Sequence, residues 1–216
     1  METASLLPCP LFRGIAAEEL PALLKCLNGY EKSYQRQEIL LHAGELCERF
    51  GILVSGTVQI LKEDHHGNAT LVAQVLPGEL FAEAFVCGAM PLSVTVMAAA
   101  DSMVLWLDYR RFLSPCQKAC VFHRQLTANL LKILATRNRF LTGRLEHLSQ
   151  RSLREKVLSF LEEQVQVQGS SSVQLPFDRQ GMADYLAADR SALSAVLSRM
   201  QKDGVIQYHK NHFTLL

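Results

Sequence analysis

Four side chains close to the C-terminus have types and a spacing suited to reading a nucleic acid. Residues 190–202 fit an amphipathic helix, because their apolar side chains share one face. The other face carries, at positions i, i+1, i+4 and i+8, the residues Arg190, Ser191, Ser194 and Ser198. An arginine can donate two hydrogen bonds to guanine O6 and N7, and serines can reach bases or phosphates. Since serine is a weak helix former, an ordinary solvated face is the poorer explanation. We expect this face to enter the major groove of double-stranded DNA.

A short helix and a hairpin are expected to position this face. Asp178 can cap a helix over residues 179–186, and residues 187–189 form a three-residue connection. The apolar sides of the two helices face each other, with the small Ala183 allowing close approach, as in a helix-turn-helix. Beyond residue 202, alternating apolar residues around Lys210 predict a terminal hairpin, the wing. Further DNA contacts, of the kind that fix register on phosphates, are expected from Arg179, Gln180, Lys202 and Lys210.

The preceding segment, residues 117–148, predicts one long helix, because it contains no proline and only one glycine. An apolar stripe, interrupted by charged residues, follows the helical period and predicts a dimer seam at Phe122, Leu126, Leu130, Ile133, Arg137 and Phe140. The alternative is that this helix lies across another part of its own chain. After it, Ser152 with Glu155 forms the capping-box pattern of a helix over residues 153–163. Residues 164–172 then read as a loop.

The first half of the chain reads as short strands. After a short helix ending near residue 28, segments of five to seven residues alternate between apolar and polar side chains over residues 31–108. Glycines at 44, 56, 67 and 78 separate them, which favours a small antiparallel barrel or roll. The whole pattern is an α+β chain of three parts: a β-roll domain over residues 1–116, a long dimerisation helix over 117–148, and a winged helix-turn-helix over 149–216.

Composition places the chain among ordinary globular proteins. Of its 216 residues, 49% are hydrophobic and 20% are charged, enough to bury a core. Residues 1–110 carry 7 Lys and Arg against 13 Asp and Glu, and residues 111–216 carry 15 against 8. We therefore expect only the rear half to meet a polyanion. No basic start precedes an apolar run at the N-terminus, and no segment is long and apolar enough for a bilayer. A cytoplasmic location without membrane contact is expected.

Several segments resemble the cyclic-AMP receptor / fumarate-nitrate regulator (CRP/FNR) family of bacterial transcription factors, over essentially the whole chain. They are residues 9–15, Ser55-Gly56, residues 77–83, residues 189–194 and residues 197–206. The resemblance implies a homodimer whose recognition helices read a near-palindromic site, with half-site centres about 34 Å apart. It also implies RNA polymerase as a partner. By position, Arg190 is the family's base-reading arginine. Ser191 and Ala195 replace residues common in the family, which puts its usual operator in doubt, and Ala187 replaces a common turn glycine.

The resemblance also implies an effector pocket between roll and long helix, here at Glu83, Leu92, Ser93, Thr95, Leu141 and Thr142. In the cyclic-AMP branch, a glutamate holds the ribose hydroxyl and an Arg-Ser pair holds the phosphate. Glu83 and Ser93 match that pattern, but Leu92 stands where the arginine is needed. A buried phosphate without its arginine is costly, so we expect an effector other than cyclic AMP, such as a hydrophobic or aromatic ligand, or none.

Metal cofactors find weaker support. Cys116 and Cys120, at i and i+4, are the best candidates for metal ligands or for a redox-sensing pair, and free thiols are the simpler interpretation. An iron–sulfur cluster would need Cys9 and Cys26 as well, which lack clustered spacing. Haem would need an axial ligand such as Cys9, His42 or His123. The sequence therefore argues against both groups and leaves the effector unidentified.

An enzyme and a protein-binding module are the two alternatives to a DNA-binding regulator. The chain shows no nucleophile–base pair, phosphate-binding loop or paired-carboxylate motif, so we expect no enzymatic activity. A cyclic-nucleotide-type binding module whose C-terminal half contacts only proteins would share the same roll. Specific enrichment of a DNA motif would distinguish the regulator from that module.

Overall fold

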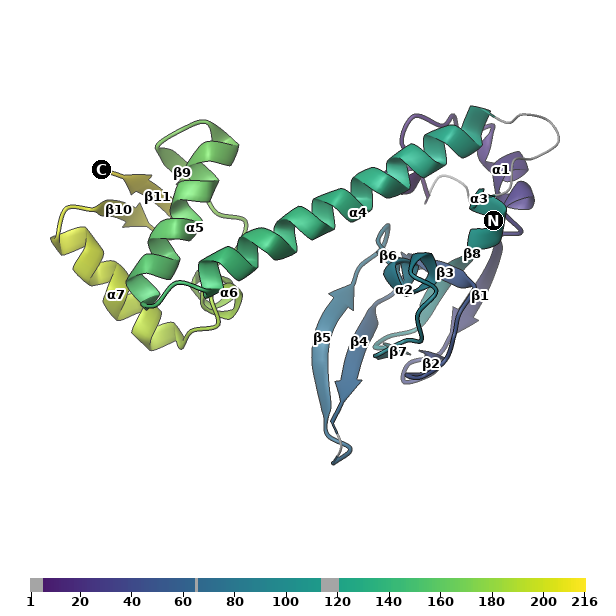
Figure 1. The fold of residues 1–216 in the computed structure, drawn as a ribbon, viewed down its shortest axis with the longest axis horizontal. Helices are drawn as coiled ribbons and strands as arrows, with labels where there is room; N and C mark the ends of the chain where they lie inside the picture. The colour runs from purple at the N-terminus through teal and green to yellow at the C-terminus, as the bar shows by residue number, and fades with distance from the viewer. Residues whose placement is uncertain (1–5, 65, 114–120) are drawn as a thin grey trace. The chain divides into compact units, whose positions relative to one another are not determined.

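The computed structural model describes residues 6–64, 66–113 and 121–216, which belong to two compact units (Figure 1). The first unit is Met1–Ala135 and the second is Thr136–Leu216, so that the long helix α4 (Val121–Leu148) contributes to both. Within the described ranges, no helix combines the length and the apolar character needed to cross a membrane.

Two four-stranded antiparallel sheets form the first unit (Figure 1). The order of the first is β1-β8-β3-β6, with bounds Tyr30–Tyr34, Ser102–Asp108, Arg49–Ser55 and Leu80–Phe81. The order of the second is β2-β7-β4-β5, with bounds Ile39–Leu41, Thr95–Ala98, Val58–Glu63 and Ala69–Val75. The remaining elements of this unit are the 3₁₀ helix Pro10–Phe12 and helices α1 (Leu20–Cys26), α2 (Glu83–Cys87) and α3 (Tyr109–Leu113). The expected roll is confirmed, and the glycines at 44, 56, 67 and 78 all have positive φ.

Strand β8 is buried on both sides, and its alternating side chains serve two cores. Val104 and Trp106 lie in a cluster with residues of the second sheet, where the Trp106 indole N–H donates to the Tyr34 hydroxyl at 3.0 Å. Leu105 and Leu107 lie in the other cluster, with α1 and the first half of α4. Gly51 on the neighbouring strand is required by packing, because a Cβ there would lie 2.2 Å from the Phe81 ring.

The first half of α4 corrects the predicted dimer seam. Leu126 and Leu130 are buried in the core of their own unit, and Phe122 and Ile133 pack against that core. The Asn129 side chain is buried with them and donates to the carbonyl oxygens of Leu11 and Arg13, at 2.8 and 2.9 Å. Leu126 and Leu130 thus cover the roll of their own chain, as in the alternative interpretation, whereas Phe122 and Ile133 remain partly exposed. Arg137 and Phe140, the other two seam residues, are exposed.

The second unit contains the expected winged helix-turn-helix. Its helices are α5 (Leu153–Gln168), α6 (Arg179–Tyr185) and α7 (Arg190–Lys202), and its sheet has the order β10-β11-β9, with bounds Ile206–His209, His212–Leu215 and Ser172–Gln174. The Ser152–Glu155 capping box is present, and hydrogen bonds from Ser152 hold the pKa of the Glu155 carboxyl below its usual value. A single core joins α5, α6, α7 and the wing.

Two boundaries of this unit differ from prediction. Helix α5 continues five residues beyond residue 163, because Val165 packs against the core and Gly169, with φ of 65°, ends the helix. Residues 172–174 form β9 and pair with β11, so the wing has a third strand. A three-residue strand preceded by serines has too little alternation to be recognised in sequence.

Ala187 occupies the turn between α6 and α7 at φ of 48°, a left-handed conformation that favours glycine. Substituting Ala187→Gly should raise the free energy of unfolding by about 0.5–1 kcal/mol. Relief of about 1–2 kcal/mol of backbone strain exceeds the added freedom of glycine in the unfolded chain. Urea unfolding measures the change. The matched control is Ala192→Gly, in the helical part of α7, which should instead lower stability by about 1 kcal/mol. Destabilisation at both positions would contradict the strain at Ala187.

Candidate nucleic-acid interface

Asp189 fixes the N-terminus of helix α7. Its carboxylate accepts hydrogen bonds from the backbone N–H groups of Ser191 and Ala192, at 2.8 and 2.9 Å, and from the Ser191 hydroxyl. The Ser191 side chain, followed by these backbone donors, lowers the pKa of Asp189 and keeps the carboxylate ionised. The Ser191 hydroxyl is therefore part of the helix cap here, not an unengaged group for a base.

The exposed face of α7 leaves one strong unpaired donor. Arg190 is exposed, and among the described residues no acidic side chain pairs with its guanidinium. The Ser194 hydroxyl donates to the Arg190 carbonyl oxygen at 2.9 Å, and the Ser198 hydroxyl lies 3.4 Å from the Tyr208 hydroxyl. Since the expected serine contacts are already bonded locally, Arg190 carries most of the capacity of this face to read a base edge.

Arg179, expected to contact DNA, lies between α6 and the wing. Its guanidinium stacks over the rings of Tyr208 and Phe213, with centroids 4.9 and 5.6 Å away, and Nη2 donates to the Lys210 carbonyl oxygen at 3.5 Å. Desolvation, together with the nearby Arg190 charge, lowers its pKa. Nη1 is buried and has no hydrogen-bond partner among the described residues. Arg179 thus holds the wing and keeps one donor that an anion can satisfy.

The remaining expected contacts are on the surface of the same unit. Gln180, Lys202 and Lys210 are exposed, and the Gln180 amide donates to Asp184 at 2.8 Å. Lys210 is at the tip of the wing, with φ of 54°. Arg199 is also exposed at the C-terminal end of α7, and sequence reasoning missed it because it lies just outside the serine-bearing stripe.

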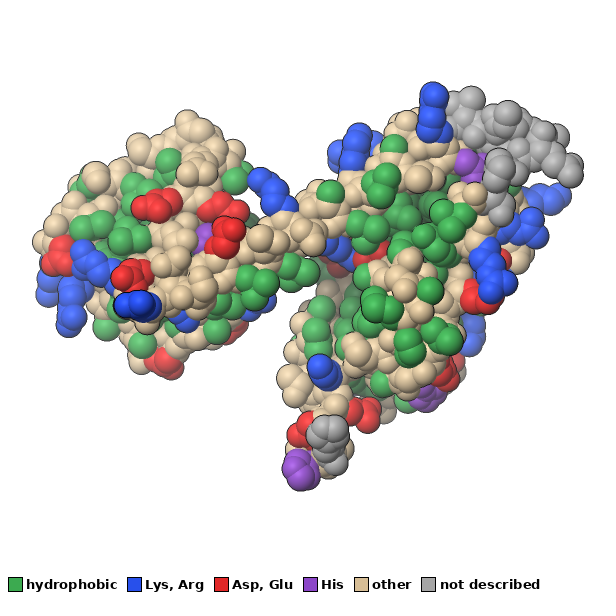
Figure 2. All heavy atoms as spheres, viewed as in Figure 1, with side chains coloured by type: hydrophobic (Ala, Val, Ile, Leu, Met, Phe, Trp, Pro, Cys, Tyr) green, Lys and Arg blue, Asp and Glu red, His purple; other side chains and the backbone are tan. Residues whose placement is uncertain are grey.

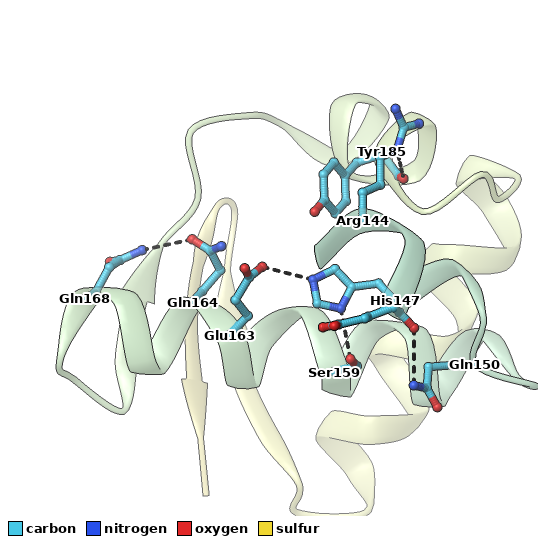
Figure 3. A network of polar contacts seen from close by, with 9 residues as sticks. Arg144, His147, Gln150, Ser159, Glu163, Gln164, Gln168 and Tyr185 are labelled. Atoms are coloured by element: carbon cyan, nitrogen blue, oxygen red, sulfur yellow. Dashed lines mark hydrogen bonds and ion pairs between the residues drawn. The ribbon is translucent and has the colours of Figure 1, made fainter. Parts of the chain in front are cut away.

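A polar clasp, which we define as Arg144, His147, Ser159 and Glu163, fixes the winged helix to the end of α4 (Figure 3). Arg144 donates through Nε to the Tyr185 carbonyl oxygen at 3.0 Å and through Nη2 to the Asp184 carbonyl oxygen at 3.1 Å. The buried His147 ring lies 2.9 Å from both the Ser159 hydroxyl and the Glu163 carboxylate. Because a carboxylate only accepts, Nε2 carries a proton. Arg144 is one of the charged residues that interrupt the apolar stripe of residues 117–148, and the sequence alone did not indicate this role.

The positive charge of residues 111–216 is unevenly distributed. Residues 111–148 carry 7 Lys and Arg against a single acidic residue, whereas residues 149–216 carry 8 against 7. Acidic and basic side chains accordingly lie interspersed over the second unit in Figure 2. The basic excess of the rear half therefore belongs to the segment of the long helix. The winged helix therefore has single lysine and arginine side chains, and no large net positive charge, for contact with DNA.

The expected effector residues are only partly suited to a cyclic nucleotide. Glu83 and Thr95 are buried, Ser93 is exposed, and Leu92 is 2% exposed within the apolar core of the roll. Leu141 and Thr142 are exposed on α4. The position that the resemblance gives to a phosphate-binding arginine is thus occupied by a buried leucine in an apolar cluster, where burying a charge is costly.

The candidate metal ligands that the structure describes do not gather into one group of three. Cys9 is fully buried, and desolvation raises its pKa to about 11, which keeps it a thiol. The Cys26 sulfur lies 3.7 Å from His123 Nε2. In residues 6–64, 66–113 and 121–216, no three His, Cys, Asp or Glu side chains are grouped to hold a metal ion. Cys116 and Cys120 lie outside the described residues.

Known proteins combine the same two parts in the same order. Residues 31–119 match the cyclic nucleotide-binding domain family, and residues 155–216 match the Crp-like helix-turn-helix domain family. The fold and the interface thus define a DNA-binding transcription regulator with a cyclic-nucleotide-type sensor domain. The chain belongs to the CRP/FNR family.

Individual relatives agree with this assignment. The cyclic AMP receptor protein of Thermus thermophilus is 25% identical over 198 residues, spanning 92% of this chain and 88% of that protein. The transcriptional activator protein FnrL of Cereibacter sphaeroides is 25% identical over 213 residues, spanning 92% and 82%. The crystal structure of Thermus thermophilus catabolite activator protein shares the fold, with a TM-score of 0.55 and 22% identity over 96% of this chain and 93% of that one.

The stacking of Arg179 on the wing predicts that replacing this arginine by lysine destabilises the wing, whereas the same replacement at Arg199 does not. Arg179→Lys and Arg179→Gln should both destabilise the wing by about 1 kcal/mol, because neither replaces the planar guanidinium over the two rings. Amide hydrogen exchange of β10 and β11 measures the effect. The control is Arg199→Lys, on the exposed side of α7, which should leave exchange unchanged. Full protection of the wing in Arg179→Lys would show that charge alone, not stacking, is what matters.

Proposed function

We propose that the protein is an effector-responsive, sequence-specific transcription regulator that binds a near-palindromic operator as a homodimer. The observation that carries the proposal is the placement of Arg190, exposed and unpaired by any described acidic group, on a helix held by the Asp189 cap and the wing. A bidentate arginine–guanine contact supplies about 1–3 kcal/mol of discrimination. Family membership makes RNA polymerase the expected partner and the cytoplasm the expected location.

The dimer is proposed to form along a different side of α4 from the predicted seam. Leu131, Asn138, Leu141 and Leu145 follow at spacings of seven, three and four residues, which are a and d positions of a coiled-coil heptad. Leu134, the intervening d position, packs partly against the core of the first unit. Leu131, Leu141 and Leu145 are 62%, 57% and 68% exposed, which is unusual for leucines in register on one helix. A second copy of α4 would cover them. A single asparagine at an a position is a known device for fixing the alignment of two helices.

The effector is proposed to be something other than cyclic AMP. Leu92 fills the position at which a phosphate would need a cation, and its neighbours in the core are apolar. A pocket near Glu83 and Thr95 would therefore favour a ligand without a phosphate, of hydrophobic or aromatic character.

Arg190→Ala should relax specificity at one base step of each half-site. A motif is first enriched from random DNA with the unmodified protein, and affinities are then measured for every single-base variant. Loss of the arginine should remove about 1–3 kcal/mol of discrimination at one position. Lys202→Ala is the control and should weaken binding to all variants alike, with a shallower salt dependence. An unchanged base preference in Arg190→Ala would refute the assignment of Arg190.

Replacing Leu141 and Leu145 together by glutamate should convert the dimer to a monomer. Charges in the seam would face each other in apolar surroundings, and each lost leucine contact is worth about 1.5–3 kcal/mol. Sedimentation velocity gives the mass. The control is Leu71→Glu, an exposed leucine on β5 in the first unit. Leu71→Glu should remain a dimer. A double variant that also remains dimeric would place the interface elsewhere.

A further inference from the structure

Four aromatic rings from different parts of the second unit converge beside the polar clasp. Tyr185 of α6 has its ring centroid 4.9 Å from Phe160 of α5, 5.8 Å from Phe177 and 5.8 Å from Phe140 of α4. Phe160 and Phe177 stack on each other at 5.8 Å. Rings at these separations attract one another, and their faces and edges can make stacked or edge-to-face contacts with the ring of a bound aromatic molecule.

A cavity of about 220 Å³ lies against these rings. Its apolar lining is completed by Val167 and Pro176, and its polar lining consists of Thr136, Arg139, Glu163 and Gln164. Phe140 is 55% exposed at this cavity, and Val167 is more than half exposed. Two apolar side chains at the edge of this cavity are thus exposed to water. A bound apolar group would cover them, which is favourable because it removes apolar surface from water. The volume is below the range of drug-sized ligand sites, so the occupant must be small.

The polar groups of the lining select among small aromatic molecules. Glu163 accepts from His147, and a carboxylate retains further lone pairs. The Gln164 amide oxygen accepts from Gln168 at 3.4 Å, which leaves its N–H₂ as a donor. Figure 3 shows both side chains rising from α5 toward the side on which Tyr185 lies. Arg139 and Glu163 carry opposite charges, so a ligand with a net charge of either sign gains one ionic contact and meets one repulsion.

We propose that this aromatic pocket binds a small neutral aromatic molecule of one or two rings that carries one N–H or O–H donor. The rings of Phe140, Phe160 and Tyr185 contact the ligand's ring, and the Glu163 carboxylate accepts its hydrogen bond. None of the residues lining the pocket is among the expected DNA contacts or the expected effector residues of the roll. The pocket is therefore a second ligand site, distinct from the one that the family resemblance implies.

Occupation of this pocket bears on the position of the helix-turn-helix. The lining comes from α4, α5 and α6, and α6 is also held by Arg144 through the carbonyl oxygens of Asp184 and Tyr185. A ligand that adds contacts among these three helices stabilises the arrangement that the polar clasp already favours.

The test uses three molecules that share one ring system: indole, which is neutral with an N–H donor, indole-3-acetate, an anion, and tryptamine, a cation. Each is titrated into the full-length protein without DNA, and backbone amide shifts are followed by NMR. Indole should bind saturably and more tightly than either charged analogue, with the largest shifts around Phe140, Glu163 and Tyr185. Because no DNA is present, the result is independent of the proposed regulator function.

Two variants place the binding in the pocket. Phe140→Ala should weaken indole binding at least about fivefold, because an aromatic contact is lost. Val167→Trp should abolish binding by filling the cavity from a second exposed position. Leu71→Ala, which also removes an exposed apolar side chain, should leave the affinity unchanged. The proposal is overturned by non-saturable binding of indole, by tighter binding of either charged analogue, or by unchanged affinity in Phe140→Ala and Val167→Trp.

Discussion

Helix α4 has apolar residues on more than one side. The side that its own chain buries determines which apolar side chains remain exposed for pairing with another helix. Leu126 and Leu130 lie in the core of the first unit, and His147 lies in the polar clasp of the second. Leu131, Leu141 and Leu145 are left in solvent. Burial of one leucine is worth about 1.5–3 kcal/mol, so three exposed leucines in register represent several kcal/mol available for pairing with another helix. The proposed dimer follows from this division of the helix surface.

The DNA-contacting surface depends on fixed side chains more than on bulk charge. The segment 149–216 has an excess of only one positive charge, so the sequence-independent attraction of the winged helix for phosphate is modest. Several potential contacts also have structural partners: Ser191 serves the Asp189 cap, Ser194 bonds to the helix backbone, and Arg179 stacks on the wing. In the proposed regulator, base discrimination therefore falls mainly to Arg190, whose helix these contacts hold in place.

Much of the fold could be predicted from the sequence, and the errors have common physical causes. Helix α7 was predicted with its correct bounds, because apolar periodicity and the Asp189 cap agree. The side of α4 that the chain itself buries could not be predicted, since apolar periodicity does not distinguish the core of the same chain from an interface with another. The local bonds of the serine hydroxyls and of Arg144 could not be predicted for a related reason: residue type shows that a group can bond, and only the structure shows its partner. That Leu92 is buried among apolar side chains fits its residue type, and the nature of the effector stays a prediction.

The central claim is that two chains, joined along α4, present two copies of α7 to one duplex. Native mass spectrometry of the protein bound to its enriched DNA motif tests this most directly, because it reports the number of chains on each duplex. The account predicts two chains on a duplex with both half-sites and much weaker binding to a duplex with one. A single chain on the complete motif, bound as tightly as on one half-site, would contradict it.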